Sequence, residues 1–70
     1  MADLTTKYIA RNIKRIRLEK GLTQAALADK ATVNVNYYAK VERAEIKPSA
    51  EIYEKIVKAL KVKSSDIFPF

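Results

Sequence analysis

The sequence predicts an all-α domain of five helices, and two features of the chain lead to this prediction. Its 70 residues include one glycine and two prolines, and β-branched residues do not alternate with polar ones over any useful length, so strands are not expected. Apolar residues recur every three or four positions, which is the spacing of an amphipathic helix. A chain this short has apolar side chains for a single core, so we expect residues 1–70 to form one domain near the lower size limit for independent folding.

The first helix is predicted to begin at Thr5 or Thr6, whose hydroxyl group can cap the first turn. It should end at Gly21, because the left-handed residue that follows a last helical turn is least costly without a Cβ. The buried stripe is expected to consist of Ile9, Ile13 and Ile16, opposite exposed Arg11, Lys14 and Arg15. We interpret Arg11 and Lys14 as surface charge.

A pair of short helices joined by a tight turn is predicted between about residues 23 and 43. Thr23 can cap the first of them, which should end near Lys30. Asn34 can cap the second, which should run from Val35 to Arg43. The expected core-facing residues are Leu27, Ala28 and Ala31 in the first helix and Tyr38 and Val41 in the second.

A fourth helix is predicted to follow the Pro48-Ser49 dipeptide and to run from Ala50 to Leu60. Its apolar side chains recur at helical spacing, so one face should pack on the core. The inward residues are expected to be Tyr53, Ile56, Val57 and Leu60. A short fifth helix should start at Ser64 or Ser65.

The composition argues against most kinds of catalytic and metal site. The chain contains no cysteine and no histidine, so disulfides and thiolate or imidazole metal ligands are not expected. It has no glycine-rich phosphate loop and no paired carboxylates in a plausible cleft, so we expect no enzyme, no cofactor and no small-molecule ligand. No apolar run approaches the ~18 residues of a membrane span and no signal peptide is recognisable, so a cytoplasmic protein is expected.

The outward face of the helix predicted from Val35 to Arg43 differs from those of the other helices. No acidic residue occurs between Thr32 and Val41, and the chain carries a net charge of +6, which attracts polyanions such as nucleic acid. The side chains that project from this face are Val35, Asn36, Ala39 and Lys40. Such residues can contact base edges and thymine methyl groups in the major groove of DNA. An ordinary solvated helix face would explain them equally well.

Several segments, in the same order and spacing, resemble one known family from about Tyr8 to Phe68. The segments are Ile13–Arg17, Lys20–Ala28, Val33–Asn34, Val41–Arg43, Pro48–Ser49 and Lys55–Leu60, together with Tyr37. As a set they are similar to the XRE family, the phage repressor and Cro type of helix-turn-helix protein. The resemblance implies a repressor-like DNA-binding domain of five helices, in which Thr23–Lys30 is the first helix of the motif and Asn34–Arg43 is the recognition helix.

The resemblance also implies a function. The chain is expected to be a sequence-specific regulator of transcription that binds double-stranded DNA, and a repressor acting as a homodimer on a two-fold symmetric operator. Base-reading roles are implied for Val35, Asn36 and Lys40. Val35 offers only apolar contact, so it reads a thymine methyl group or reads nothing. The alternative is a protein-binding module of the same fold, such as an antitoxin or an adaptor, because a fold does not determine a function.

Contacts to the DNA backbone are implied for four further residues, namely Gln24, Tyr37, Arg43 and Lys47. Gln24 begins the first helix of the motif, where its side chain and the backbone N–H groups suit a phosphate. Plain capping of the helix is the alternative for Gln24. For Arg43 and Lys47 the alternative is simple solvation. Arg11 and Lys14 of the first helix are weaker candidates for such contacts, and surface charge is the default interpretation for both.

The resemblance implies that Arg17 and Glu42 form a partly buried ion pair that fixes the angle between helices. Thr32 and Ala44 depart from the family, which commonly has glycine at both positions. Because a side chain at positive φ is costly, the turn at Thr32 either avoids that conformation or is strained. Tyr38 replaces a smaller aliphatic residue, so its hydroxyl group must reach water or a polar partner.

The segment Ile67–Phe70 contains two phenylalanines. An apolar patch on the surface of so small a protein is a reasonable two-fold interface. We predict that Ile67 and Phe70 lie in a dimer interface and that Phe68 closes the core.

Overall fold

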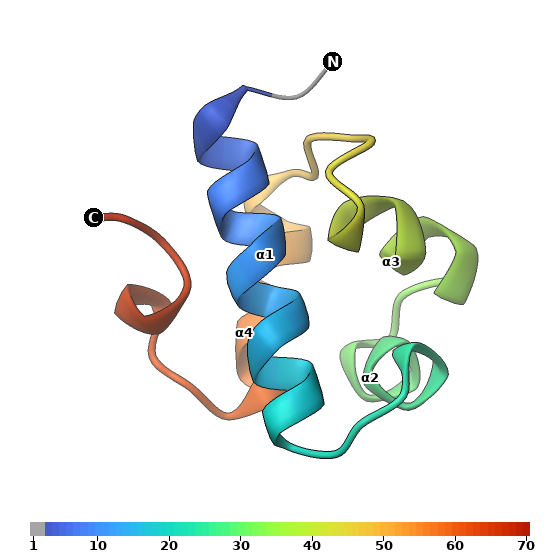
Figure 1. Ribbon diagram of the computed structural model, residues 1–70. Helices are drawn as coiled ribbons and strands as arrows, with labels where there is room; N and C mark the ends of the chain where they lie inside the picture. The colour runs from blue at the N-terminus through green and yellow to red at the C-terminus, as the bar shows by residue number, and fades with distance from the viewer. Residues whose placement is uncertain (1–2) are drawn as a thin grey trace.

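Four α-helices and one short 3₁₀ helix make up the fold in the computed structural model, which describes residues 3–70 (Figure 1). The elements are α1 (Leu4–Glu19), α2 (Gln24–Ala31), α3 (Val35–Glu42), α4 (Ala50–Leu60) and the 3₁₀ helix η1 (Ser64–Asp66). No strand occurs among these residues, so the all-α class is confirmed. The prediction of five helices is wrong in its last member, because η1 is a single 3₁₀ turn. Pro69 disfavours the α conformation at Phe68, which leaves no room for a longer helix.

The start of α1 also differs from the prediction. Asp3, not Thr5 or Thr6, caps the helix, and its carboxylate accepts a hydrogen bond from the backbone N–H of Thr6 at 2.7 Å. Thr6 lies inside the first turn and is buried. An aspartate is favoured at this place because its charge also interacts with the positive end of the helix dipole.

The other three helices begin where the sequence predicts. Thr23, Asn34 and Ser49 cap α2, α3 and α4, respectively. Each side-chain oxygen accepts a hydrogen bond from a backbone N–H two or three residues further along the chain, at 2.8–3.3 Å. These bonds satisfy N–H groups that the helices themselves leave without partners.

All four helices contribute to one core, and most of its members were expected. The buried residues that form this core cluster are Ile9, Ile13, Ile16, Leu27, Ala28, Ala31, Tyr38, Val41, Ile56, Leu60 and Ile67. Phe68 packs on this core, and its ring forms a T-shaped pair with that of Tyr53 at a centroid distance of 5.3 Å. The expected stripe of α1 and the inner faces of α2, α3 and α4 are therefore in place.

Ile67 corrects the prediction of a dimer interface. Its side chain has no exposed surface, and its backbone carbonyl accepts a hydrogen bond of 2.9 Å from the side-chain amide of Asn12 on α1. Ile67 thus fastens the C-terminal segment to the core and offers no surface to a second copy. Phe70 is 87% exposed, so the interface prediction is limited to that residue.

The four α-helices all end in the same way. The residue with left-handed backbone is Gly21 after α1, Thr32 after α2, Ala44 after α3 and Lys61 after α4. After α2, for example, the N–H of Thr32 donates to the carbonyl of Asp29, and the N–H of Val33 donates to that of Ala28. This is the paired hydrogen bonding of a Schellman motif, which favours glycine at the left-handed position. Thr32 has φ 57°, so the turn between α2 and α3 is strained by a β-branched side chain.

We predict that Thr32→Gly stabilises the protein by about 0.5–1 kcal/mol. A left-handed residue with a Cβ costs about 1–2 kcal/mol, and the additional chain entropy of glycine cancels about half of the gain. Thr32 is exposed, so few other contacts are lost. Urea denaturation measures the change in the free energy of unfolding.

Thr5→Gly is the matched control, because Thr5 is exposed and has ordinary helical backbone within α1. Glycine should destabilise the protein at that position. A loss of stability in Thr32→Gly comparable to that in Thr5→Gly would contradict the strain at Thr32.

Candidate nucleic-acid interface

The exposed face of α3 presents the residues predicted to read bases. Tyr38 and Val41 are buried, which turns the opposite side of the helix outward. Asn36 and Lys40 are one turn apart and exposed, and Arg43 follows one turn later at the end of the helix. The structure therefore brings these three polar side chains into a single stripe, which we call the α3 stripe (Asn36, Lys40 and Arg43).

The two apolar residues expected on the outward face of α3, Val35 and Ala39, differ in how exposed they are. Val35, at the first position of α3, is 40% exposed. Ala39 was expected to project outward but is only half exposed. Val35 can therefore make an apolar contact with a bound molecule at the start of α3.

The residues predicted to contact a phosphate backbone do not all lie together. Arg43 is exposed at the end of the α3 stripe and forms an ion pair with Glu45. Tyr37 is half-buried against the core. Lys47 lies in the loop before α4, with its ammonium group 4.0 Å from the carboxylate of Asp3. Gln24 is the first residue of α2 and is half-buried.

A buried ion pair joins α1 to α3 behind the stripe. The side chains of Arg17 and Glu42 are 8% and 2% exposed. The guanidinium Nε donates to Glu42 Oε2 at 2.8 Å and Nη2 donates to Oε1 at 2.9 Å. The remaining Nη1 donates to the backbone carbonyl of Leu22 at 2.6 Å. Arg17 therefore holds the turn after α1 as well as α3.

Two further donors reach the same carboxylate, and sequence reasoning identified neither contact. The hydroxyl group of Tyr38 donates to Glu42 Oε2 at 2.5 Å, and Nε2 of Gln24 donates to Oε1 at 3.1 Å. Tyr38 and Glu42 are four residues apart on α3, and that spacing was a signal for the first contact. The hydroxyl group of this fully buried tyrosine therefore has a polar partner. We call Arg17, Gln24, Tyr38 and Glu42 together the Glu42 network.

The Glu42 network keeps its carboxylate charged. Burial by itself would raise the pKa of Glu42 above its ordinary value of 4.5, but hydrogen bonds from Arg17, Tyr38 and Gln24 outweigh burial and lower it. Because the folded-state pKa lies below the unfolded value, the stability that Glu42 contributes is present above pH 4.5 and is lost as the pH falls through the folded-state pKa.

The donors of the network hold their protons. The bond to Glu42 raises the pKa of Arg17, and burial raises the pKa of the Tyr38 hydroxyl group. Among residues 3–70, no buried side-chain nitrogen or oxygen lacks a hydrogen-bond partner. A charged pair that is fully hydrogen-bonded can remain buried, because its partners replace the lost water.

The side-chain amide of Gln24 bonds to Glu42 and keeps a second N–H group for another acceptor. Only one N–H of its side-chain amide is needed for the bond to Glu42. The other amide N–H stays available at the N-terminal end of α2, where the helix dipole favours an anion. The structural contact and a phosphate contact are therefore compatible in one side chain.

Residues 3–70 contain no group of three or more acidic, histidine or cysteine side chains that could hold a metal ion. None of the helices between these limits is long and apolar enough to cross a membrane.

The comparisons with known proteins agree with this architecture. Residues 13–67 match the model of a family described as helix-turn-helix. The immunity repressor protein of Bacillus phage phi105 is 39% identical over 59 residues, which cover 84% of this chain and 41% of the repressor. The chain thus spans less than half the length of this relative.

Solved structures give the same result. The wild-type restriction-modification controller protein C.Esp1396I has a TM-score of 0.86 and 33% identity, over 90% of this chain and 82% of that chain. It has also been solved as a tetramer in complex with its natural 35 base-pair operator. The controller protein C.AhdI from Aeromonas hydrophila has a TM-score of 0.86 and 25% identity, over 90% of this chain and 96% of that chain.

We predict that Glu42→Ala lowers the free energy of unfolding by about 3–5 kcal/mol, because it leaves the buried Arg17 guanidinium without its charge partner. Tyr38 and Gln24 lose their acceptor as well. Chemical denaturation at neutral pH measures the loss.

Glu19→Ala serves as the control, since Glu19 forms an exposed ion pair with Arg15 on α1. An exposed pair of this kind contributes about 0–1 kcal/mol. Equal losses of unfolding free energy in the two variants would show that the Glu42 network does not stabilise the fold.

Proposed function

The chain belongs to the XRE family of helix-turn-helix proteins, and from this premise we propose that it binds double-stranded DNA of specific sequence and represses transcription. The observation that carries the proposal is the exposed α3 stripe, backed by the Glu42 network. A solvated helix face needs no rigid support, whereas a helix that reads DNA must be held at a fixed angle to its neighbours.

The dimensions and chemistry of α3 suit the major groove. An α-helix with its side chains is about 10–12 Å wide, close to the ~12 Å width of that groove in B-DNA. Asn36 can donate to and accept from a base edge, and Lys40 can donate to guanine acceptors. Val35 is exposed enough to touch a thymine methyl group. We assign base reading to these three residues.

Contacts to the sugar-phosphate backbone of the DNA would position α3 without reading the base sequence. Gln24 has a free amide N–H at the N-terminal end of α2, and Arg43 lies at the far end of the α3 stripe. These two residues can therefore bind phosphates on either side of the major groove, one at each end of the helix-turn-helix motif. Tyr37 and Lys47 are further candidates for such contacts.

The relatives support a role in repression. One of them is named an immunity repressor, and another was solved on its operator. Since the chain spans 41% of the repressor's length, the likeness concerns the helix-turn-helix portion of that protein. A regulator of this kind acts where the DNA is, and we propose a cytoplasmic location.

We further propose that the chain acts as a homodimer on a two-fold symmetric operator. One recognition helix covers only a few base pairs, and two copies can read half-sites about one helical turn apart. Phe70 stacks on Phe68 at a centroid distance of 5.7 Å and leaves most of its surface exposed. It borders an apolar groove between α1 and α4 whose walls include Tyr53 and Val57.

The same groove favours a second candidate function, that of a protein-binding module such as an antitoxin or adaptor. An exposed aromatic residue beside an apolar hollow can hold a segment of another protein. Such a module needs no base-reading stripe, so binding to duplex DNA distinguishes the two functions. A selection from random duplex DNA should enrich a two-fold symmetric site; no enrichment would favour the module.

We predict that Asn36→Ala changes the preferred base at one position of each half-site, at a cost of about 1–3 kcal/mol on the preferred site. Arg43→Ala should weaken binding to every sequence alike, because phosphates carry no sequence information. Binding titrations on the selected site and on a mixed-sequence duplex separate the two effects.

Glu45→Ala is the control for Arg43, because it removes the carboxylate that pairs with the guanidinium and should not weaken binding. If Asn36→Ala and Arg43→Ala lost affinity equally on both duplexes, the division into reading and positioning residues would be wrong.

We predict that Phe70→Ala weakens the homodimer by about a hundredfold or more in Kd, because each of the two copies loses an aromatic contact worth about 1.5–3 kcal/mol, or about 3–6 kcal/mol per dimer. Phe70 is 87% exposed, so the monomer fold should be unaffected. Sedimentation equilibrium at micromolar concentration gives the dimer Kd.

Leu18→Ala is the matched control, since Leu18 is also apolar and 57% exposed but does not line the groove beside Phe70. An unchanged Kd in Phe70→Ala would exclude this residue from the interface.

A further inference from the structure

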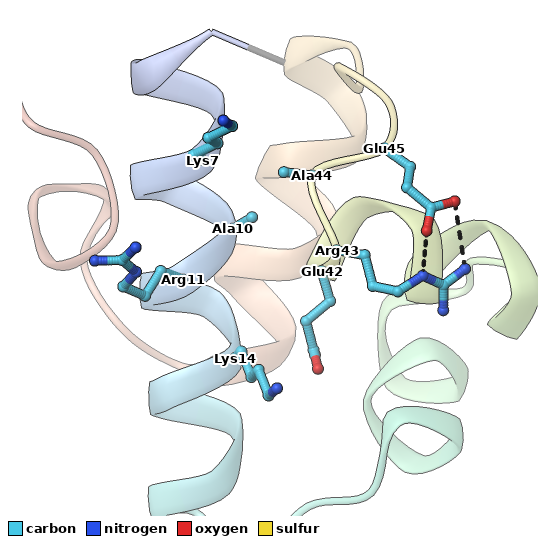
Figure 2. Close-up of a pocket in the computed structure, with 8 residues that line it drawn as sticks. All are labelled: Lys7, Ala10, Arg11, Lys14, Glu42, Arg43, Ala44 and Glu45. Carbon is cyan, nitrogen blue, oxygen red and sulfur yellow. Dashed lines mark hydrogen bonds and ion pairs between the residues drawn. The ribbon is translucent and has the colours of Figure 1, made fainter. Parts of the chain in front are cut away.

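A second positively charged surface lies beside the α3 stripe, in an open groove of about 670 Å³ between α1 and the end of α3 (Figure 2). Two small residues, Ala10 and Ala44, line it. Lys7 and Lys14 of α1 stand on one side and Arg43 on the other. We call this feature the α1–α3 groove.

The two lysines point into the same region. They are seven residues apart, so two helical turns, or about 10.5 Å along the axis, separate them on one side of α1. Figure 2 shows both ammonium groups on the side of α1 that faces α3, whereas the guanidinium group of Arg11 points to the other side. Among residues 3–70, no carboxylate lies within ion-pair distance of Lys7 or Lys14, although Arg15 and Arg17 on the same helix are both paired.

The acidic residues that border the groove are already neutralised. Both carboxylate oxygens of Glu42 accept from Arg17 and from the other members of the Glu42 network. Glu45 is paired with Arg43. Arg11 also lines the groove, but its guanidinium group points away from α3, so the uncompensated charge that faces α3 is that of the two lysines, and it attracts an anion.

We propose that the α1–α3 groove binds the sugar-phosphate backbone of the DNA whose bases the α3 stripe reads, an inference that rests on the proposed function. Arg43 belongs both to the α3 stripe and to the groove wall, so a strand that reaches Arg43 passes the mouth of the groove. The small side chains of Ala10 and Ala44 let that strand approach closely.

The spread of charge favours a polymer over a small anion. A single phosphate is bound by cations that converge on one point, whereas Lys7 and Lys14 are about two helical turns apart. One DNA strand carries a charge every ~3.4 Å along the duplex axis, so this length corresponds to about three phosphates. Such contacts add affinity and salt dependence on any sequence.

Salt titrations of the double variant Lys7→Gln/Lys14→Gln test the proposal. Each phosphate contact contributes about 0.9 to the slope of log K against log salt concentration. The slope should therefore fall by about 1.8 from that of the wild type, and equally on the selected site and on a mixed-sequence duplex. Each single variant should lower it by about 0.9. Circular dichroism shows that the variants are folded.

Lys61→Gln/Lys63→Gln is the matched control, because both lysines are exposed, lie outside the groove and remove the same charge. If the slope of the groove variant falls no further than that of this control, the groove does not bind DNA and the proposed function stands. If the wild type binds neither duplex at low salt, the proposed function fails and this inference fails with it.

Discussion

The carboxylate of Glu42 is the point on which the arrangement of the helices depends. A buried charge is costly unless every lone pair has a donor, and the donors to Glu42 come from α1, α2 and α3. A shift of any one of these helices would remove a hydrogen bond from a charge that water does not reach. Because any change in the angle between these helices would bring that penalty, the Glu42 network restricts the geometry of the fold as well as stabilising it.

This restriction connects the two kinds of contact that we propose for DNA. Gln24 bonds to the carboxylate and also marks the N-terminal end of α2, while Glu42 itself is the last residue of α3. The position of the proposed phosphate site at α2 relative to the α3 stripe is thus fixed through one carboxylate. A mobile α3 would have to pay the entropy of ordering at each binding event, and a preorganised one avoids that cost.

Much of the fold was predictable because its determinants are local. A cap is a hydrogen bond within three residues, and the buried faces follow the helical period, so α2, α3 and α4 were placed correctly. For α1 the sequence predicts Thr5 or Thr6 as the cap, whereas Asp3 caps the helix and Thr6 is buried inside its first turn, where tertiary packing covers it. Ile67 was misplaced for the same kind of reason, because the group that fixes it, Asn12, is 55 residues away.

The residues that were hardest to interpret from the sequence flank α3. Thr32, at the end of α2, and Ala44, two residues after α3, have left-handed backbone, where glycine would be unstrained. Their N–H groups, and those of Val33 and Glu45, still complete the hydrogen bonding that ends α2 and α3. Side chains at these positions also restrict the unfolded chain more than glycine would, which offsets part of the strain. A helix of only eight residues depends on both of its ends. The side chain of Asn34 caps the first end of α3, and at the second end the backbone hydrogen bonds of Ala44 and Glu45 outweigh an unfavourable local conformation.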